Sequence, residues 1–137
     1  MPIRVWSAAL PANAVSKERT VMAKKILIID DDEVVVRYLT SLFEDNGYVT
    51  CSASSSSEGL EQVRREQPDL ITLDLQMPGE WGPRFYRKLR QDTALRDIPV
   101  LVISGIDGDH AIKDAVAFIP KPFDADKLLG IVKRTIG

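Results

Sequence analysis

Cysteine, histidine and long apolar runs are scarce in this chain of 137 residues. It contains one cysteine, Cys51, and one histidine, His110. A single cysteine cannot form a disulfide within the chain, and this usage favours a reducing, cytoplasmic location. Neither residue has a cysteine or histidine partner at the spacing of a metal site. We therefore interpret Cys51 as a small buried apolar residue and His110 as an exposed one.

The chain also lacks an excess of charge of either sign. Its 18 basic and 20 acidic side chains leave a net charge of −2. Nucleic-acid-binding domains usually present a concentrated basic face, so we expect no direct contact with nucleic acid. No apolar run approaches the roughly 18 residues of a membrane helix, so we expect no membrane insertion. Apolar residues still make up 45% of the chain, enough for the core of one domain.

The first 22 residues differ in pattern from the rest. They follow neither a helical nor a strand period, and they contain Pro2 and Pro11. A signal peptide is not favoured, because the apolar run Val5–Leu10 has six residues and a secretory signal needs roughly 7–15. We predict a flexible N-terminal extension over residues 1–22 and a single domain over residues 23–137.

Short apolar runs alternate with segments of helical period across the predicted domain. The runs are continuous, as in parallel strands that are buried on both faces. This alternation predicts an α/β fold with a doubly wound five-stranded parallel sheet and helices on both faces, in which ligands bind beyond the carboxyl ends of the strands. The predicted strands are Lys25–Ile29, Tyr48–Ser52, Leu70–Asp74, Val100–Ile103 and Ala117–Pro120. The predicted helices are Glu33–Asn46, a short one through Glu58 to Glu66, Pro83–Gln91, Asp109–Ala115 and Asp124–Ile136.

The apolar period of the first helix places five of its side chains on one face. The residues at three- and four-residue spacing are Val35, Tyr38, Leu39, Leu42 and Phe43.

Polar residues stand directly after four of the predicted strands. Asp30 and Asp31 follow the first strand, Asp74 closes the third, Ser104 follows the fourth and Lys121 follows the fifth. Taken singly, the first acids could be a helix cap, Asp74 a turn residue and Ser104 an ordinary strand-end serine. Because the carboxyl ends of parallel strands share one edge of the sheet, their joint placement favours a common site.

The acidic residues have the oxygen ligands that Mg²⁺ prefers. We predict that Asp31 and Asp74 bind the ion directly, that Asp30 holds a coordinated water, and that the backbone carbonyl of Gln76 is a further ligand. Two bare carboxylates ~4 Å apart repel by roughly 4 kcal/mol at an effective dielectric near 20. The metal-free site should therefore raise the pKa of at least one carboxyl group and destabilise the fold.

Asp74 is the best candidate for a nucleophile. An aspartate carboxylate can take a phosphoryl group to give an acyl phosphate. Asp74 stands alone at its strand end, before a turn that leaves room for a phosphate. Lys121 supplies a second positive charge beside the metal, and Ser104 offers a hydroxyl to a phosphate oxygen.

Four segments of the sequence resemble the receiver domain of two-component response regulators, over about Lys24–Gly137. They occur in the order found in that family, and each lies at the end of a predicted strand. The segments are ILIIDDDE at Ile26–Glu33, LITLDLQMPG at Leu70–Gly79, VLVISG at Val100–Gly105 and IPKPF at Ile119–Phe123.

The resemblance assigns a role to each candidate residue. It implies that Asp74 is the phosphoacceptor, that Asp30 and Asp31 form the acidic metal pair, and that Lys121 binds the phosphoryl group. Ser104 would be the hydroxyl switch, paired with the aromatic residue three positions before the lysine. That residue is Phe118, and the resemblance also implies a cis peptide bond between Lys121 and Pro122.

In such a system a sensor histidine kinase or a histidine phosphotransfer protein donates the phosphoryl group, with Mg²⁺ as cofactor. Phosphorylation would then switch the binding of a partner protein by shifting a two-state equilibrium. The chain ends directly after its last predicted helix, so we expect a stand-alone receiver. We do not expect an enzyme beyond the catalysis of its own phosphoryl uptake and hydrolysis.

Two features depart from the family pattern. Only 16 residues separate Ser104 from Lys121, so the fourth helix is predicted to be shortened or partly unwound. Trp81 stands where relatives often carry an acid.

Parts of the sequence are also compatible with two other functions. A protein-interaction module that signals without phosphate is favoured mildly by the short fourth helix, but the complete set of site residues argues against it. A phosphatase is disfavoured because Leu75 and Gln76 follow Asp74, where such enzymes place a second acid.

Overall fold

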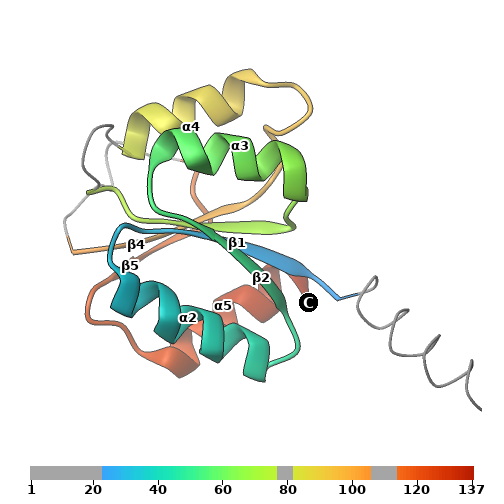
Figure 1. Cartoon of the computed structure of the whole chain (residues 1–137). Helices are drawn as coiled ribbons and strands as arrows, with labels where there is room; N and C mark the ends of the chain where they lie inside the picture. The colour runs from blue at the N-terminus through green and yellow to red at the C-terminus, as the bar shows by residue number, and fades with distance from the viewer. Residues whose placement is uncertain (1–22, 77–81, 106–113) are drawn as a thin grey trace, which may run out of the picture.

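The computed structural model describes residues 23–76, 82–105 and 114–137. Five parallel strands form one sheet in the order β2-β1-β3-β4-β5. In Figure 1, α3 and α4 cover one face of this sheet, and α2 and α5 cover the other. The predicted doubly wound α/β fold is thereby confirmed. The strands are β1 (Lys25–Ile29), β2 (Val49–Ala53), β3 (Leu70–Leu73), β4 (Val100–Ser104) and β5 (Ala117–Pro120), and the helices are α2 (Glu33–Asp45), α3 (Ser56–Glu66), α4 (Gly82–Gln91) and α5 (Ala125–Ile136).

Two apolar clusters fill the spaces between the sheet and its helices. Alternate residues of β1 belong to different clusters, because successive strand side chains point to opposite faces. Leu27 packs in the cluster that includes Phe85 of α4, and Ile28 packs in the one that includes Phe43 of α2. Full burial of each such side chain contributes about 1.5–3 kcal/mol, so the continuous apolar strands hold both helical layers.

Local signals fix both ends of α2. The Asp32 side chain caps the helix by accepting a hydrogen bond from the Val34 amide at 2.9 Å. At the other end, Gly47 has a φ of 91°, the left-handed conformation that glycine adopts at little cost. The helix ends at Asp45, with Asn46 as its cap, one residue before the predicted end.

Four strand boundaries, in three of the strands, differ from prediction by one residue. β2 begins at Val49 because the Tyr48 amide donates to the Phe43 carbonyl and closes the end of α2, 3.1 Å away. The pairing with β1 starts at the next residue, and β2 consequently ends at Ala53. β3 ends at Leu73, before Asp74, and β4 includes Ser104.

Tyr38, which the apolar period places on one face of α2 with Leu39 and Phe43, is not buried with them. Its side chain is 50% exposed, whereas Leu39 and Phe43 are buried. Tyr38 lies at the margin of the packed stripe on α2, where its ring contacts that of Phe123 at a centroid distance of 5.7 Å. A three- and four-residue period identifies the residues that share one face of a helix, but it does not show how much of that face is buried.

The predicted helix Asp109–Ala115 lies mostly outside the described residues. Its predicted end is wrong, because Asp114 and Ala115 are not helical. The chain passes directly into the sheet there, since the Val116 amide donates to the Val100 carbonyl at 2.8 Å. The predicted extension over residues 1–22, and the residues Trp81 and His110, also lie outside the described part of the chain.

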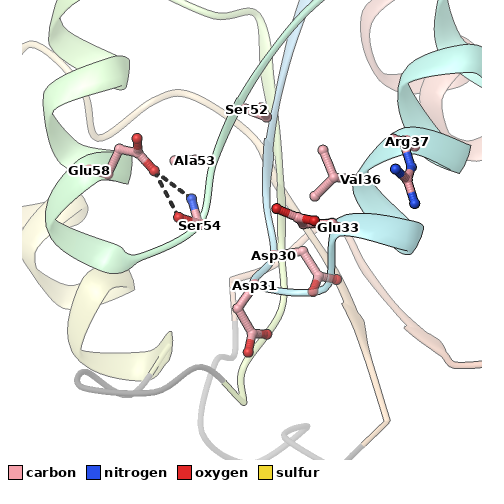
Figure 2. A pocket seen from close by; sticks show the side chains of 9 residues that line it. All are labelled: Asp30, Asp31, Glu33, Val36, Arg37, Ser52, Ala53, Ser54 and Glu58. Carbon is pink, nitrogen blue, oxygen red and sulfur yellow. Dashed lines mark hydrogen bonds between the residues drawn. The ribbon is translucent and has the colours of Figure 1, made fainter.

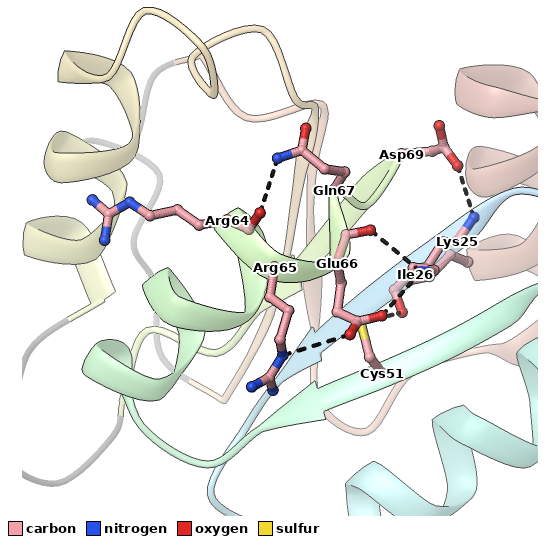
Figure 3. Close-up of polar contacts among 8 residues, drawn as sticks. All are labelled: Lys25, Ile26, Cys51, Arg64, Arg65, Glu66, Gln67 and Asp69. Carbon is pink, nitrogen blue, oxygen red and sulfur yellow. Dashed lines mark hydrogen bonds and ion pairs between the residues drawn. The ribbon is translucent and has the colours of Figure 1, made fainter.

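A network of charged side chains ties the start of β1 to the elements beside it (Figure 3). The Lys25 ammonium donates to a carboxylate oxygen of Glu66 at 2.9 Å and to the Glu66 carbonyl at 3.3 Å. The Lys25 amide donates to a carboxylate oxygen of Asp69 at 2.8 Å. These contacts join β1 to the end of α3 and the approach to β3, at the amino end of the sheet.

None of the helices in the described segments is both long enough and apolar enough to cross a membrane.

Candidate functional site

The carboxyl edge of the sheet brings the predicted site residues together. Asp30 and Asp31 follow β1, Asp74 follows β3, Ser104 ends β4 and Lys121 follows β5. In the sequence they span 92 positions (121 − 30 + 1), but parallel pairing places all these strand ends at one edge. The Lys121 amide donates to the Ser104 carbonyl at 3.0 Å, which aligns the last two members of the set.

Asp74 lies at the centre of this group and is only 5% exposed. Its Oδ1 atom accepts hydrogen bonds from the Ser104 hydroxyl at 3.0 Å and from the Gln76 amide at 3.1 Å. Its Oδ2 atom lies 3.5 Å from the ammonium nitrogen of Lys121. The carboxylate is thus oriented by three groups from three different segments, and two of them are the predicted partners Ser104 and Lys121.

Asp30 is the nearest partner of the lysine. Its Oδ2 atom lies 2.7 Å from the Lys121 ammonium nitrogen, and its Oδ1 atom accepts from the Asp32 amide at 2.9 Å. Asp30 is 3% exposed. Because both oxygens already accept hydrogen bonds, its geometry agrees with a supporting role more than with a direct metal bond.

Burial and charge shift the pKa of two groups in the site. Burial raises the pKa of the Asp30 carboxyl above its usual value, the hydrogen bonds from Lys121 and Asp32 oppose that rise, and the charge of Asp74 adds to it. Burial alone would lower the pKa of the Lys121 ammonium, but its hydrogen bond to Asp30 and the two carboxylate charges raise the pKa above normal. The pKa of Asp30 is thus raised mainly by burial, and the repulsion from Asp74 that the sequence led us to expect makes a smaller contribution.

Three carboxylates could hold a divalent cation. Asp30, Asp31 and Asp74 each offer a carboxylate oxygen, and these atoms lie within 4.8 Å of one another. Asp31 is exposed, whereas the other two are buried. A hard oxygen donor set with one open side fits Mg²⁺, which usually keeps several waters. The residues present therefore fit the predicted ion.

The acidic strand end opens into a cavity of about 430 Å³ between α2 and α3, shown in Figure 2. Most of its lining has no signal in the sequence, because Ser52 and Glu58 line the same cavity as Asp31 only when β2 lies beside β1. Glu33 is the lining residue that the sequence could have indicated, since it directly follows the acidic residues Asp30–Asp32. The lining residues are Asp30, Asp31, Glu33, Val36, Arg37, Ser52, Ala53, Ser54 and Glu58.

Two features implied by the family resemblance also occur in the structure. The peptide bond between Lys121 and Pro122 is cis. Phe118 pairs with Val102 in the β4–β5 ladder, and its half-buried ring packs on the cluster that contains Phe85 and Tyr86. The aromatic residue thus lies on the strand next to Ser104, with its ring turned toward the core.

A parallel sheet with acids, a hydroxyl and a lysine at its carboxyl edge defines the receiver class of signalling domains, and the chain belongs to that family. The family model "Response regulator receiver domain" matches residues 26–133. The chain is therefore a phosphoacceptor signalling domain of the two-component type, not a classical enzyme.

Among curated proteins, the chain is 34% identical to protein Rrf1 of Nitratidesulfovibrio vulgaris over 116 residues, 84% of each chain. It is 31% identical to the polar-differentiation response regulator DivK of Brucella ovis over 121 residues, which covers 85% of this chain and 98% of DivK.

Solved structures show the same likeness. A sensor protein from Polaromonas sp. JS666 matches with a TM-score of 0.77 and 29% identity, over 82% of this chain and 95% of that one. A response regulator receiver protein from Pseudomonas putida matches with a TM-score of 0.75 and 26% identity, over 82% and 97% of the two chains.

Proposed function

We propose that Asp74 is the residue that accepts the phosphoryl group. One observation carries the assignment: the Asp74 carboxylate is held between the Ser104 hydroxyl and the Lys121 ammonium, at 3.0 and 3.5 Å. A carboxylate oxygen of Asp74 forms a bond to phosphorus as the bond from phosphorus to the donor nitrogen breaks. The leaving nitrogen takes up a proton, so a donor histidine becomes neutral imidazole again.

The surrounding residues serve this transfer by binding and orientation. Lys121 offers a positive charge to the oxygens of the incoming group, and Ser104 offers a hydrogen bond. Asp30 keeps Lys121 in place through their contact at 2.7 Å. Asp31 and Asp74, with the Gln76 carbonyl, would hold Mg²⁺ directly, and Asp30 would hold a coordinated water. When bound, this ion supplies charge neutralisation for the transferring phosphoryl oxygens.

Phosphorylation would switch the domain through Ser104 and Phe118. A phosphoryl group on Asp74 competes for the Ser104 hydroxyl, which donates to Asp74 in the present structure. A shift of Ser104 would change the room available to Phe118 on the neighbouring strand. The two conformations would differ in affinity for a partner protein, which is the condition for signalling.

The donor in this proposal is a sensor histidine kinase or a histidine phosphotransfer protein. The likeness to response regulators supports this class of donor. Hydrolysis of the aspartyl phosphate by the domain itself would reset the switch. A cytoplasmic location, and the division into an extension over residues 1–22 and a domain over residues 23–137, stay predictions.

Phosphoryl uptake tests the assignment of Asp74. The wild-type chain incubated with phosphoramidate and Mg²⁺ should gain the mass of one phosphoryl group, and borohydride reduction followed by peptide mapping should locate it at Asp74. Asp74→Asn should gain none. Asp97→Asn, which changes an exposed acid outside the site, should be modified like the wild type. Modification of Asp74→Asn at the wild-type rate would overturn the assignment.

A further inference from the structure

Lys121 contributes to a second feature beside the phosphoacceptor site. It lines an apolar groove of about 340 Å³ together with residues of α2 and of the loop after β5. The groove therefore joins a helix to the segment that carries the lysine. Its lining residues are Val34, Val35, Tyr38, Lys121, Pro122 and Phe123.

Two aromatic rings connect the walls of this groove. The rings of Tyr38 and Phe123 lie 5.7 Å apart between centroids, at an interplanar angle of 50°. This distance and tilt fall in the range in which aromatic pairs attract each other. Phe123 also packs on the cluster that contains Leu128 and Phe43, so one side of its ring is anchored in the core and Tyr38 adjoins it at the surface.

The helix side of the contact is rigidly held. Leu39, which follows Tyr38 in the chain, is buried in the same cluster, as is Phe43 one turn later. Tyr38 itself is half exposed. Its one described ring contact is with Phe123, which makes the link to the loop its principal structural role among the described residues.

The ammonium group of a lysine stays in one position only when the surrounding structure restrains the side chain. Its four-carbon stem has many rotamers, and holding it in one of them costs conformational entropy. The backbone of Lys121 is fixed on its amino side by the hydrogen bond to Ser104. On its carboxyl side, the next side chain that packs on the core is Phe123.

We infer that the ring pair of Tyr38 and Phe123 positions Lys121 for binding the phosphoryl group, and that Tyr38 is a positioning residue for phosphoryl transfer. The inference rests on the phosphate-binding role proposed above for Lys121. Tyr38 acts only through Phe123 and the backbone between it and Lys121, and it need not touch the phosphoryl group. The ring rather than the hydroxyl makes the contact, so phenylalanine should replace tyrosine at this position.

The first test compares variants of Tyr38 in loading with phosphoramidate and Mg²⁺. Tyr38→Ala should lower the rate constant for phosphoryl uptake by about threefold to tenfold, the effect expected from the loss of one aromatic pair. Tyr38→Phe should restore the wild-type rate. Val34→Ala is the matched control, because Val34 lines the same groove on the same helix and is 64% exposed. It should load at the wild-type rate.

The second test uses the affinity for Mg²⁺, which a general loss of structure would lower. The Lys121 ammonium is 2.7 Å from Asp30 and 3.5 Å from Asp74, so it competes with a divalent cation for these carboxylates. A loosened lysine should compete less. Tyr38→Ala should therefore bind Mg²⁺ as tightly as the wild type or more tightly in calorimetric titration, and any gain should vanish in a Lys121→Ala background.

The outcomes separate this inference from the proposed function. A wild-type chain that takes up no phosphoryl group defeats the proposed function itself. If the wild type takes up the phosphoryl group and Tyr38→Ala takes it up at the same rate, only the positioning role of Tyr38 is overturned. Equal losses in Tyr38→Ala and Val34→Ala, or weaker Mg²⁺ binding in Tyr38→Ala, would also overturn it, since they indicate a general effect on the groove or the fold.

Discussion

At the scale of single residues, the site combines burial with crowded charge. Asp30 and Asp74 are both nearly inaccessible to solvent, and one ammonium group lies between them. Buried charges of like sign are unfavourable unless a cation and hydrogen bonds compensate. Lys121 supplies part of that compensation, and the raised pKa of Asp30 shows that it is incomplete.

Asp74→Asn should therefore stabilise the metal-free protein. The asparagine Oδ1 can still accept from Ser104 and Gln76, while the repulsion of Asp30 is removed. Against this, Lys121 loses a weak contact at 3.5 Å. We expect a net gain of about 1 kcal/mol in the free energy of unfolding, measured by urea denaturation with a chelator present. A clear loss of stability would contradict the picture of crowded acids.

Cys51 should react slowly in the folded protein. Its thiol is half-buried on β2, and burial, with a smaller contribution from the charge of Glu66, raises its pKa to about 11. The thiolate is the reactive form, so at pH 8 a thiol reagent should modify the native chain about a hundredfold more slowly than the urea-unfolded chain. Equal rates would show that Cys51 is not shielded.

At the scale of elements, a glycine of α3 and a glycine of α5 have different surroundings. Gly59 of α3 lies against the sheet so closely that an added Cβ atom would be 2.9 Å from Ile29 Cδ1 and 3.2 Å from Phe85 Cε1. Both neighbours are fully packed core side chains. Gly130 of α5 faces only the far end of Arg134, at 3.5 Å. Gly59 and Gly130 therefore allow the same substitution to be compared at a crowded and at an open position within a helix.

The two glycine-to-alanine variants should change stability in opposite directions. Alanine favours a helix over glycine by roughly 1 kcal/mol, so Gly130→Ala should stabilise the fold by up to that amount. Gly59→Ala gains the same preference but overpacks the core, which typically costs about 1–3 kcal/mol, so we expect a net loss of about 1 kcal/mol. Urea denaturation of both variants measures the difference. A stabilised Gly59→Ala would mean that Ile29 can move aside.

The link between β1 and α3 should depend on pH. The hydrogen bond and charge of Lys25 hold the pKa of the Glu66 carboxyl below its usual value. A carboxyl group with a lowered folded pKa stabilises the protein above its unfolded pKa, and this contribution is lost as the pH falls through the folded pKa. Glu66→Gln should therefore be less stable than the wild type at pH 7, and the two unfolding curves should converge in acid.

A matched control keeps this test specific. Asp97→Asn also removes an exposed carboxylate, but it lies outside the Lys25 network. It should follow the wild-type pH profile. A gap between wild type and Glu66→Gln that stays constant from pH 7 to pH 3 would exclude the ion pair as its cause.

At the scale of the whole molecule, the two ends of the sheet have different roles. The Lys25 network ties β1 to α3 at the amino end, whereas the carboxyl end gathers the acids and Lys121. Ligand binding at the carboxyl end should therefore stabilise the entire fold, because the ligands come from loops after separate strands that are together only in the folded chain.

Added Mg²⁺ should raise the melting temperature. At ten times the dissociation constant, a ligand that binds only the folded state stabilises it by about 1.4 kcal/mol, or roughly 5 °C for a domain of this size. Asp31→Asn should abolish most of the shift, because it removes the exposed carboxylate of the cluster. Asp97→Asn should keep it, and an equal ionic strength of sodium chloride should not reproduce it.

Sequence reasoning succeeded where the signal is local or periodic. The continuous apolar strands predicted a parallel sheet, since only strands covered on both faces have no polar alternation. The position of Asp30, Asp74, Ser104 and Lys121 after those strands predicted a shared edge. The predicted start of β2 was wrong by one residue because the Tyr48 amide donates to the Phe43 carbonyl at the end of α2, and pairing with β1 begins at Val49.

Residue order along the chain was enough to determine the sheet, its helical layers and the set of groups at its carboxyl edge, because burial of alternating apolar segments allows few arrangements. Only the folded structure decided which partners each group meets. It places Lys121 closer to Asp30 than to Asp74, turns Tyr38 toward Phe123, and opens a cavity lined by Glu58 beside Asp31. Such contacts depend on side-chain rotamers and on the approach of non-consecutive elements, for which spacing in the sequence carries no signal.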